Sequence, residues 1–327
     1  MNELTFVLPF DAASLLQETR RRLPQANGAA RSALLAVEVG LTSIHALPPV
    51  VTPESLAWTA LWTRAICLAT AVPKLLSGPS SLPLWVLSRS ALEMLIHAVL
   101  VVGDEAPAGN VPGETDDASA KLDDQRKRLR GYLAWSLTHD LKVSRSQTMA
   151  VSTTLRPEPA TRPRSEYPDH VRAALDRLLG DEEIVSDQEV ALDRRRSADA
   201  AAQSAARIQR LQGDPRLAEW TRKIHSMSEG KPTHFVPELS ALLYGLKVSD
   251  ALQRLRVPYP SLRWTLGSKV IHGSTLESSI LVAGTEAMLR VVDVPEALEE
   301  RGRDVAESCR FTLLALSALG PAIGIGA

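Results

Sequence analysis

The stretch LPLWVLSRSALEMLIHAVLVV, residues 82–102, decides the fold class. Apolar residues fill nearly every position, and a helix that is apolar almost all round is buried inside a protein. Only Arg89, Glu93 and His97 form a polar stripe in this pattern, and their spacing of four residues places them along one helix face. Because ionisable side chains are costly in lipid, we expect the core helix of a soluble protein and no membrane span.

Helix signals continue along the rest of the chain. Thr52-Pro53-Glu54 combines a capping hydroxyl, a proline for the first helical position and an acidic residue, which is typical of a helix start. Ser274 with Glu277 predicts another helix start as a capping box. No alternating strand pattern extends beyond a few residues. The sequence therefore predicts an all-α fold, an irregular multi-helix bundle of about ten helices with no significant sheet.

The helices are expected to form one domain, residues 1–327. Two segments, 103–117 and 152–167, are rich in proline, glycine or charge and are predicted to be exposed loops. Residues 187–211 carry few large apolar side chains, which indicates a surface helix. The apolar end, residues 311–327, is interpreted as the end of a core helix and a tail. The sequence leaves open whether this tail packs internally or on a partner.

Composition limits the classes of partner and compartment. The formal net charge is −1, whereas a large nucleic-acid footprint usually needs a basic excess. The local basic run 126–130 lies near acidic residues and is interpreted as a solvated helix face. Cys67 and Cys309 lie in apolar helical patterns, so both are expected to be buried and reduced, as in the cytoplasm. The start of the chain lacks the basic-then-apolar order of a signal peptide, which also favours a cytoplasmic location.

Sequence motifs for cofactors and metals are absent. The chain has no phosphate-binding loop, no dinucleotide-binding glycine motif, no His-Glu-x-x-His pair and no Gly-x-Ser-x-Gly nucleophile turn. His225 and Glu229 share a helix face, but two ligands do not make a metal site. We therefore expect no cofactor and no bound metal.

Two polar constellations are the candidates for a functional site. Arg89 and Glu93 on a buried helix need partners, because an isolated buried charge is very unfavourable. Ser268 and His272 are also four residues apart, and Gly273 is suited to end their helix. We expect Arg89, Glu93, Ser268 and His272 to converge in a polar pocket. The alternative for each segment is structural, an internal salt bridge and a tight turn between helices.

These two segments together resemble an uncharacterised bacterial all-helical family, the domain of unknown function numbered five-six-seven-seven. Its first motif, Arg-x-x-x-Glu on an early apolar helix, is matched by Arg89 and Glu93. Its second motif, a tyrosine followed by Ser-x-x-x-His-Gly-Ser, is matched by Tyr259 and by Ser268 with residues 272–274. The resemblance implies an all-helical fold and brings no assigned activity.

Two functions are compatible with these features. The first is a soluble component of a bacterial stress or phage-defence system, with a partner protein or a second copy as its partner. The alternative is a metal-independent ribonuclease toxin similar to the HEPN type, in which a histidine acts as acid and base and an arginine holds the RNA phosphate. That type needs Arg and His four to six residues apart, and the pairs Arg89 with His97 and Arg263 with His272 are spaced too widely. A salt-bridged Arg89–Glu93 pair would favour the first function, and a basic cleft the second.

Overall fold

The computed structural model describes eleven stretches of the chain. They are residues 28–44, 51–77, 81–103, 118–153, 168–179, 187–255, 257, 259–271, 280–283, 286–289 and 295–324.

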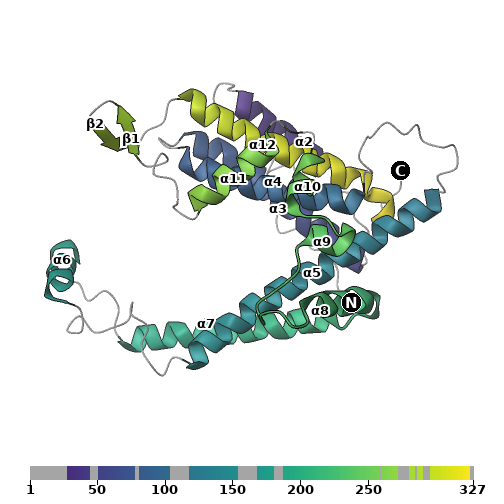
Figure 1. The fold of residues 1–327 in the computed structure, drawn as a ribbon, viewed down its shortest axis with the longest axis horizontal. Helices are drawn as coiled ribbons and strands as arrows, with labels where there is room; N and C mark the ends of the chain where they lie inside the picture. The colour runs from purple at the N-terminus through teal and green to yellow at the C-terminus, as the bar shows by residue number, and fades with distance from the viewer. Residues whose placement is uncertain are drawn as a thin grey trace. The chain divides into compact units, whose positions relative to one another are not determined.

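Nearly all regular structure in these stretches is helical (Figure 1). The α-helices are α2 Gly28–Ile44, α3 Pro53–Leu76, α4 Leu82–Val102, α5 Ala118–Thr153, α6 Asp169–Leu179, α7 Asp187–Gln212, α8 Ala218–Ser228, α9 Leu239–Tyr244, α10 Val248–Gln253, α11 Pro260–Ile271 and α12 Pro295–Ala318. Two 3-10 helices are η3 Pro215–Leu217 and η5 Gly320–Ile323. Strands β1 Ile280–Ala283 and β2 Glu286–Leu289 pair antiparallel, with Ile280 opposite Leu289. The predicted all-α class is confirmed, since one two-stranded pair is all the sheet in the described stretches.

The chain packs as two compact units. Unit 1 comprises the described residues within 1–133, 223–227 and 237–327, and unit 2 those within 134–222 and 228–236. Helices α5 and α8 each run across a boundary between the units. The interpretation of the chain as one domain stays a prediction, because continuous helices join the two units.

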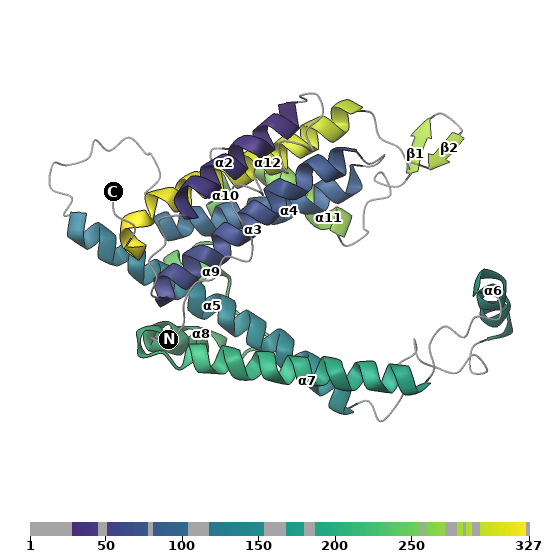
Figure 2. The same ribbon diagram turned by 180° about the vertical axis from the view of Figure 1, so that it is seen from behind.

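The core of unit 1 is built from α2, α3, α4 and α12, and α12 lies against each of the other three (Figures 1 and 2). Its largest buried side chains include Trp58 and Trp62 of α3. Trp58 donates its indole N–H to the carbonyl of Leu316, and Trp62 donates to the carbonyl of Gly40, both at 2.8 Å. Each indole thus satisfies its polar atom while joining two helices. Burial of a large apolar side chain stabilises the fold by about 2–3 kcal/mol.

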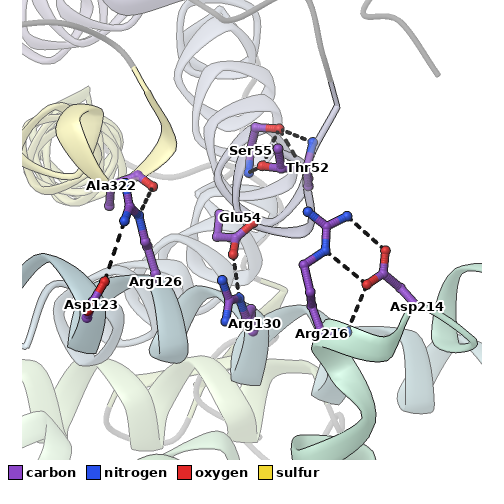
Figure 3. Close-up of polar contacts among 9 residues, drawn as sticks. All are labelled: Thr52, Glu54, Ser55, Asp123, Arg126, Arg130, Asp214, Arg216 and Ala322. Carbon is purple, nitrogen blue, oxygen red and sulfur yellow. Dashed lines mark hydrogen bonds and ion pairs between the residues drawn. The ribbon is translucent and has the colours of Figure 1, made fainter. Parts of the chain in front are cut away.

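Helix α3 begins where the sequence predicts. Thr52 Oγ1 accepts the backbone N–H of Ser55 at 3.1 Å, and Ser55 Oγ accepts the backbone N–H of Thr52 at 2.8 Å (Figure 3). Glu54, in the first turn, is buried and forms an ion pair with Arg130 of α5. The helix dipole favours a negative charge at this end, so the carboxylate is compensated twice.

Helix α4 is buried along much of its length, as predicted, with 11 of its 21 residues buried. Among the described residues, α3 and α4 have the length and apolarity to cross a membrane. However, 50% and 56% of their most apolar stretches are buried within the structure, and core helices of soluble proteins pass the same test. The two helices are therefore consistent with a soluble protein.

The cysteines differ from the expectation that both are buried. Cys309 of α12 is buried, but Cys67 of α3 is exposed. Its neighbour Ile66 faces the core, and one residue further along a helix turns the side chain by about 100°. An apolar sequence neighbourhood therefore did not fix the side of α3 on which Cys67 lies.

In unit 2, the second half of α5 pairs with α7. Gln212 Nε2 donates to Thr138 Oγ1 at 3.2 Å, and Ser144 and Ser204 share a hydrogen bond at 3.4 Å. The described side chains of α7 are mostly exposed, which confirms the predicted surface helix.

The turn that leads from α7 to α8 is held by one carboxylate. Asp214 caps η3 by accepting the backbone N–H of Arg216 at 2.9 Å, and both of its oxygens accept from the Arg216 guanidinium (Figure 3). The hydrogen bonds from the Arg216 side chain hold the pKa of Asp214 below its ordinary value.

The two predicted loops fall largely outside the described residues. Gly103 ends α4 in the left-handed conformation with φ 69°, as expected for a glycine after a helix. Residues 152 and 153 still belong to α5, so the helix extends into the second predicted loop. Residues 104–117 and 154–167 lie outside the described part, and their exposure stays a prediction.

A charge placed inside the α4 core should prevent folding. Leu92 is completely buried, so Leu92→Asp is expected to lower the free energy of unfolding by at least about 4 kcal/mol and to abolish soluble expression. Leu82→Asp is the matched control, because Leu82 is 41% exposed in the first turn of the same helix. Urea denaturation measures the free energy of unfolding of both variants. A Leu92→Asp protein as stable as the control would contradict the assigned core.

Candidate functional site

The polar stripe of α4 divides between two environments. Arg89 is half-buried and its ion-pair partner Glu93 has a side chain 45% exposed. His97, one turn further, is buried in the core, with its ring centre 5.7 Å from that of Tyr132. Although all three residues share a helix face, the first two lie toward solvent and His97 is part of the packing between α4 and α5.

Arg89 is the centre of a cluster that joins α4 to α11. Its Nη1 donates to Glu93 Oε2 at 3.0 Å, and its Nε donates to Ser268 Oγ at 3.1 Å. The guanidinium carbon lies 3.0 Å from the ring centre of Trp264, in a cation–π contact. Burial lowers the pKa of Arg89, and the charge of Glu93 partly offsets this effect.

Three of the four candidate residues are in contact, and the polar pocket expected around them stays a prediction. Arg89, Glu93 and Ser268 meet although 179 residues separate the arginine from the serine. His272 lies outside the described residues, as do the two residues that complete the second motif. A role for His272 in this cluster therefore stays a prediction.

A glycine allows α11 to approach α4 this closely. A Cβ atom at position 267 would lie 2.7 Å from Arg89 Cβ and 3.4 Å from the carbonyl oxygen of Trp85. Real Cβ atoms are not found at the shorter of these distances, and Arg89 Cβ is fixed to its own helix. Gly267 is therefore required for the hydrogen bond between Arg89 and Ser268.

A second, deeper cluster surrounds Arg263 of α11, which is 3% exposed. Its Nη2 donates to the carbonyl of Asp304 and to Ser308 Oγ, both at 2.8 Å. Its Nε and Nη2 approach Ser88 Oγ at 3.4 and 3.3 Å, and its Nε lies 3.7 Å from the Asp304 carboxylate. Its Nη1 is buried and has no hydrogen-bond partner among the described residues. Arg263 thus links α11 to both α4 and α12.

One pattern in the sequence indicates this cluster. Asp304, Ser308 and Thr312 follow one another at intervals of four on α12, like the stripe on α4. Polar residues at this spacing on a helix with a buried face indicate a shared polar contact. Ser88, one residue before Arg89, gave no such signal because a single serine is common on any helix.

Burial and charge act against each other at Asp304. Arg301 Nη1 donates to its carboxylate at 2.6 Å, and the Arg301 guanidinium lies 4.3 Å from the ring centre of Trp85. Burial nevertheless raises the pKa of the Asp304 carboxyl, and the charges of Arg263 and Arg301 offset only part of that effect. Burial likewise lowers the pKa of Arg263. Both charged forms therefore cost free energy on folding, as is usual for buried ion pairs.

The chemistry available in this region is limited. The clusters contain three arginines and three carboxylates, which balance. The arginines are Arg89, Arg263 and Arg301, and the carboxylates are Glu93, Glu300 and Asp304.

Complete burial raises the pKa of the nearby Cys309 to about 12, so its thiol is not a nucleophile at neutral pH. No group of three His, Cys, Asp or Glu residues suited to a metal ion occurs among the described residues.

The basic run of α5 is occupied by intramolecular partners, which corrects its interpretation as a solvated face. The pairs are Arg126 with Asp123 and with the carbonyl of Ala322, Arg128 with Asp124, and Arg130 with Glu54 (Figure 3 shows the first and last of these arginines). All three arginines are half-buried, and Lys127 alone in this run of basic residues is exposed. The run therefore stabilises the contacts of α5 and does not form an open cationic surface.

Comparison of the chain with models of known protein families, with curated proteins and with solved structures finds no match.

A methyl group at position 267 should separate α11 from α4. Alanine stabilises a helix by about 1 kcal/mol relative to glycine, but overpacking costs about 1–3 kcal/mol. Because the clash is with a Cβ atom, we expect Gly267→Ala to lower the free energy of unfolding by about 1–2 kcal/mol. Thr265→Ala, on the exposed face of the same helix, should change it by less than about 0.5 kcal/mol. A Gly267→Ala variant more stable than wild type would contradict the close approach.

The Asp304 carboxyl should make stability depend on pH. Its pKa is raised on folding above the ordinary value of 3.8, so the folded state binds a proton more tightly than the unfolded state. The stabilising contribution of Asp304 therefore falls as the pH rises from about 3.8 through its raised pKa. Urea denaturation of wild type and Asp304→Asn across this range tests the sign. The stability of wild type relative to the variant should decrease with rising pH, and an increase would contradict the assignment.

Proposed function

We propose that the chain is a cytoplasmic, helical component of a bacterial stress or phage-defence system that acts by binding a partner protein. In this proposal the clusters around Arg89 and Arg263 hold the binding scaffold together and perform no catalysis. The resemblance to the domain of unknown function five-six-seven-seven belongs to the same proposal.

The observation that carries the proposal is the engagement of the arginines. An RNA-cleaving site needs a cation directed at a phosphate and not already neutralised by a carboxylate. Arg89 instead contacts Glu93, Ser268 and the Trp264 ring, and Arg263 contacts acceptors on α4 and α12. The balance of charge in these clusters favours internal cohesion over the binding of a polyanion.

The contact between the two sequence motifs supports the resemblance. The Arg-x-x-x-Glu motif and the serine of the second motif meet through the hydrogen bond from Arg89 to Ser268. Residues that lie far apart in sequence and form one contact are the kind that a family retains together.

The HEPN-like ribonuclease is the second candidate, and one observation favours it. Ser268 lies against Arg89, and His272 follows Ser268 by four residues, the spacing of one helical turn. A histidine near Arg89 would supply the acid and base of such an enzyme. Arg89 and His272 would still depart from the HEPN type, in which the arginine and the histidine lie four to six residues apart.

Expression in a bacterial host separates the two functions. Wild type, His272→Ala and the control His225→Ala, an exposed histidine on α8, are induced to equal levels. Growth and the integrity of total RNA are then followed. The proposed binding function predicts the same growth and the same intact RNA for all three proteins.

Growth arrest and RNA degradation with wild type and with His225→Ala, relieved by His272→Ala, would establish the ribonuclease instead. The control variant distinguishes a specific requirement for His272 from a general effect of losing a histidine.

A further inference from the structure

Exposed apolar side chains gather on α11 and α12 of unit 1. Eight large apolar side chains are exposed in the described residues; three of them lie on these two helices and a fourth, Tyr259, directly precedes α11. The four are Tyr259 (77% exposed), Leu262 (55%), Phe311 (38%) and Leu314 (43%). The other four are distributed singly over α2, α4, α5 and α7. Single exposed apolar residues are ordinary, whereas a group of them indicates an interaction site.

The two pairs belong to one surface because Arg263 joins their helices. Its guanidinium binds Asp304 and Ser308, so the first turn of α11 lies opposite this turn of α12. Leu262 precedes Arg263 by one residue, and Phe311 follows Ser308 by about one turn. Both apolar residues therefore lie within about one turn of the residues that the Arg263 side chain joins.

Tyr259 is held in a fixed and strained conformation at the start of this surface. It lies between Pro258 and Pro260, and its φ is 48°, a left-handed value that costs a non-glycine residue of order 1–3 kcal/mol. Its carbonyl accepts the backbone N–H of Arg263 at 3.0 Å. Because the ring is exposed, its own burial does not offset the strain. Because the two prolines restrict the backbone here, little backbone entropy is lost when a partner covers the tyrosine.

Exposed arginines lie near this surface, and the exposed Asp250 of α10 carries the opposite charge. Arg310 is exposed, and its guanidinium carbon lies 6.0 Å from the ring centre of Phe311. Arg254, at the end of α10, is also exposed, and α10 packs against α11. Neither arginine has an ion pair in the described part of the chain. Glu307 lies on the same helix as Phe311, but it is half-buried and its charge acts on Arg263.

We propose that the surface of Tyr259, Leu262, Phe311 and Leu314, bordered by Arg310, docks an acidic amphipathic helix of a partner protein. The proposal rests on the proposed function, for which it supplies the surface and the kind of partner. Tyrosine and arginine are enriched among the residues that dominate protein interfaces. Acidic side chains beside an apolar stripe complement the exposed arginines.

Two other occupants fit the surface less well. A second copy in a two-fold contact would bring the same arginines toward each other, and like charges oppose association. Each arginine near an anionic membrane contributes only about 1 kcal/mol to the free energy of binding, so two arginines would hold the protein there weakly.

The test uses the full chain and two synthetic helices of about 18 residues, five turns each. Both carry one leucine stripe, and the remaining positions are glutamate in one and lysine in the other. Fluorescence anisotropy is expected to show saturable binding of the glutamate helix and at least tenfold weaker binding of the lysine helix. Arg310→Glu should weaken the binding of the glutamate helix and strengthen the binding of the lysine helix. Since Arg310 is exposed, this variant should fold, which circular dichroism verifies.

The double variant Tyr259→Ala with Phe311→Ala should weaken binding of the glutamate helix at least tenfold, and Leu35→Ala should leave it unchanged. Leu35 is the matched control because it is 43% exposed on α2, outside this surface. Equal binding of both peptides, or binding insensitive to Arg310→Glu, overturns the proposal.

Two further outcomes also overturn it in favour of another occupant. Binding to phosphatidylserine vesicles that the double variant abolishes would assign the surface to a membrane. A dimer in sedimentation that the double variant dissociates would assign it to a second copy. Neither outcome bears on RNA cleavage dependent on His272, so failure of this surface is distinguishable from failure of the proposed function.

Discussion

The buried guanidinium of Arg263 and the half-buried one of Arg89 need polar partners, and much of the architecture of unit 1 follows from that requirement. Arg263 is 3% exposed and carries a charge that cannot remain unpaired in a core. Only helices brought together from distant parts of the chain supply its acceptors, Ser88 from α4 and Ser308 from α12. The same approach of α11 to α4 places Ser268 on Arg89. The polar contacts thereby select one register of the three helices, which apolar packing alone would leave less specific.

This use of charge also explains why the arginines described in these clusters and in residues 126–130 do not form an open cationic surface on unit 1. Arg89 and Arg263, and also Arg126, Arg128 and Arg130 of α5, each have a carboxylate or carbonyl partner within unit 1. Ion pairs of this kind contribute specificity more than net stability, since burial penalises both charged groups. Arg310, in contrast, is exposed and has no ion pair among the described residues.

Several features were predictable because they depend on local sequence. The all-α class follows from helical periodicity, and the start of α3 follows from its capping hydroxyl and proline. The burial of α4 follows from a helix that is apolar on nearly every side. The meeting of Arg89 with Ser268 was predictable as well, since a buried arginine requires a distant polar partner.

The sequence by itself determined most of the helices, their apolar faces and the need of the buried charges for partners, but the helix expected after Ser274 is wrong, since residues 280–289 contain the paired strands β1 and β2. Only the tertiary structure decided which partners these are. Ser88 was not predictable as a partner of Arg263, because a single serine on a helix carries no signal until a second helix lies against it. Cys67 was expected in the core and is exposed, since rotation of α3 about its axis is set by packing. The physical reason is common to these cases: local propensity acts within a few residues, whereas side-chain pairing depends on how helices far apart in the chain cross.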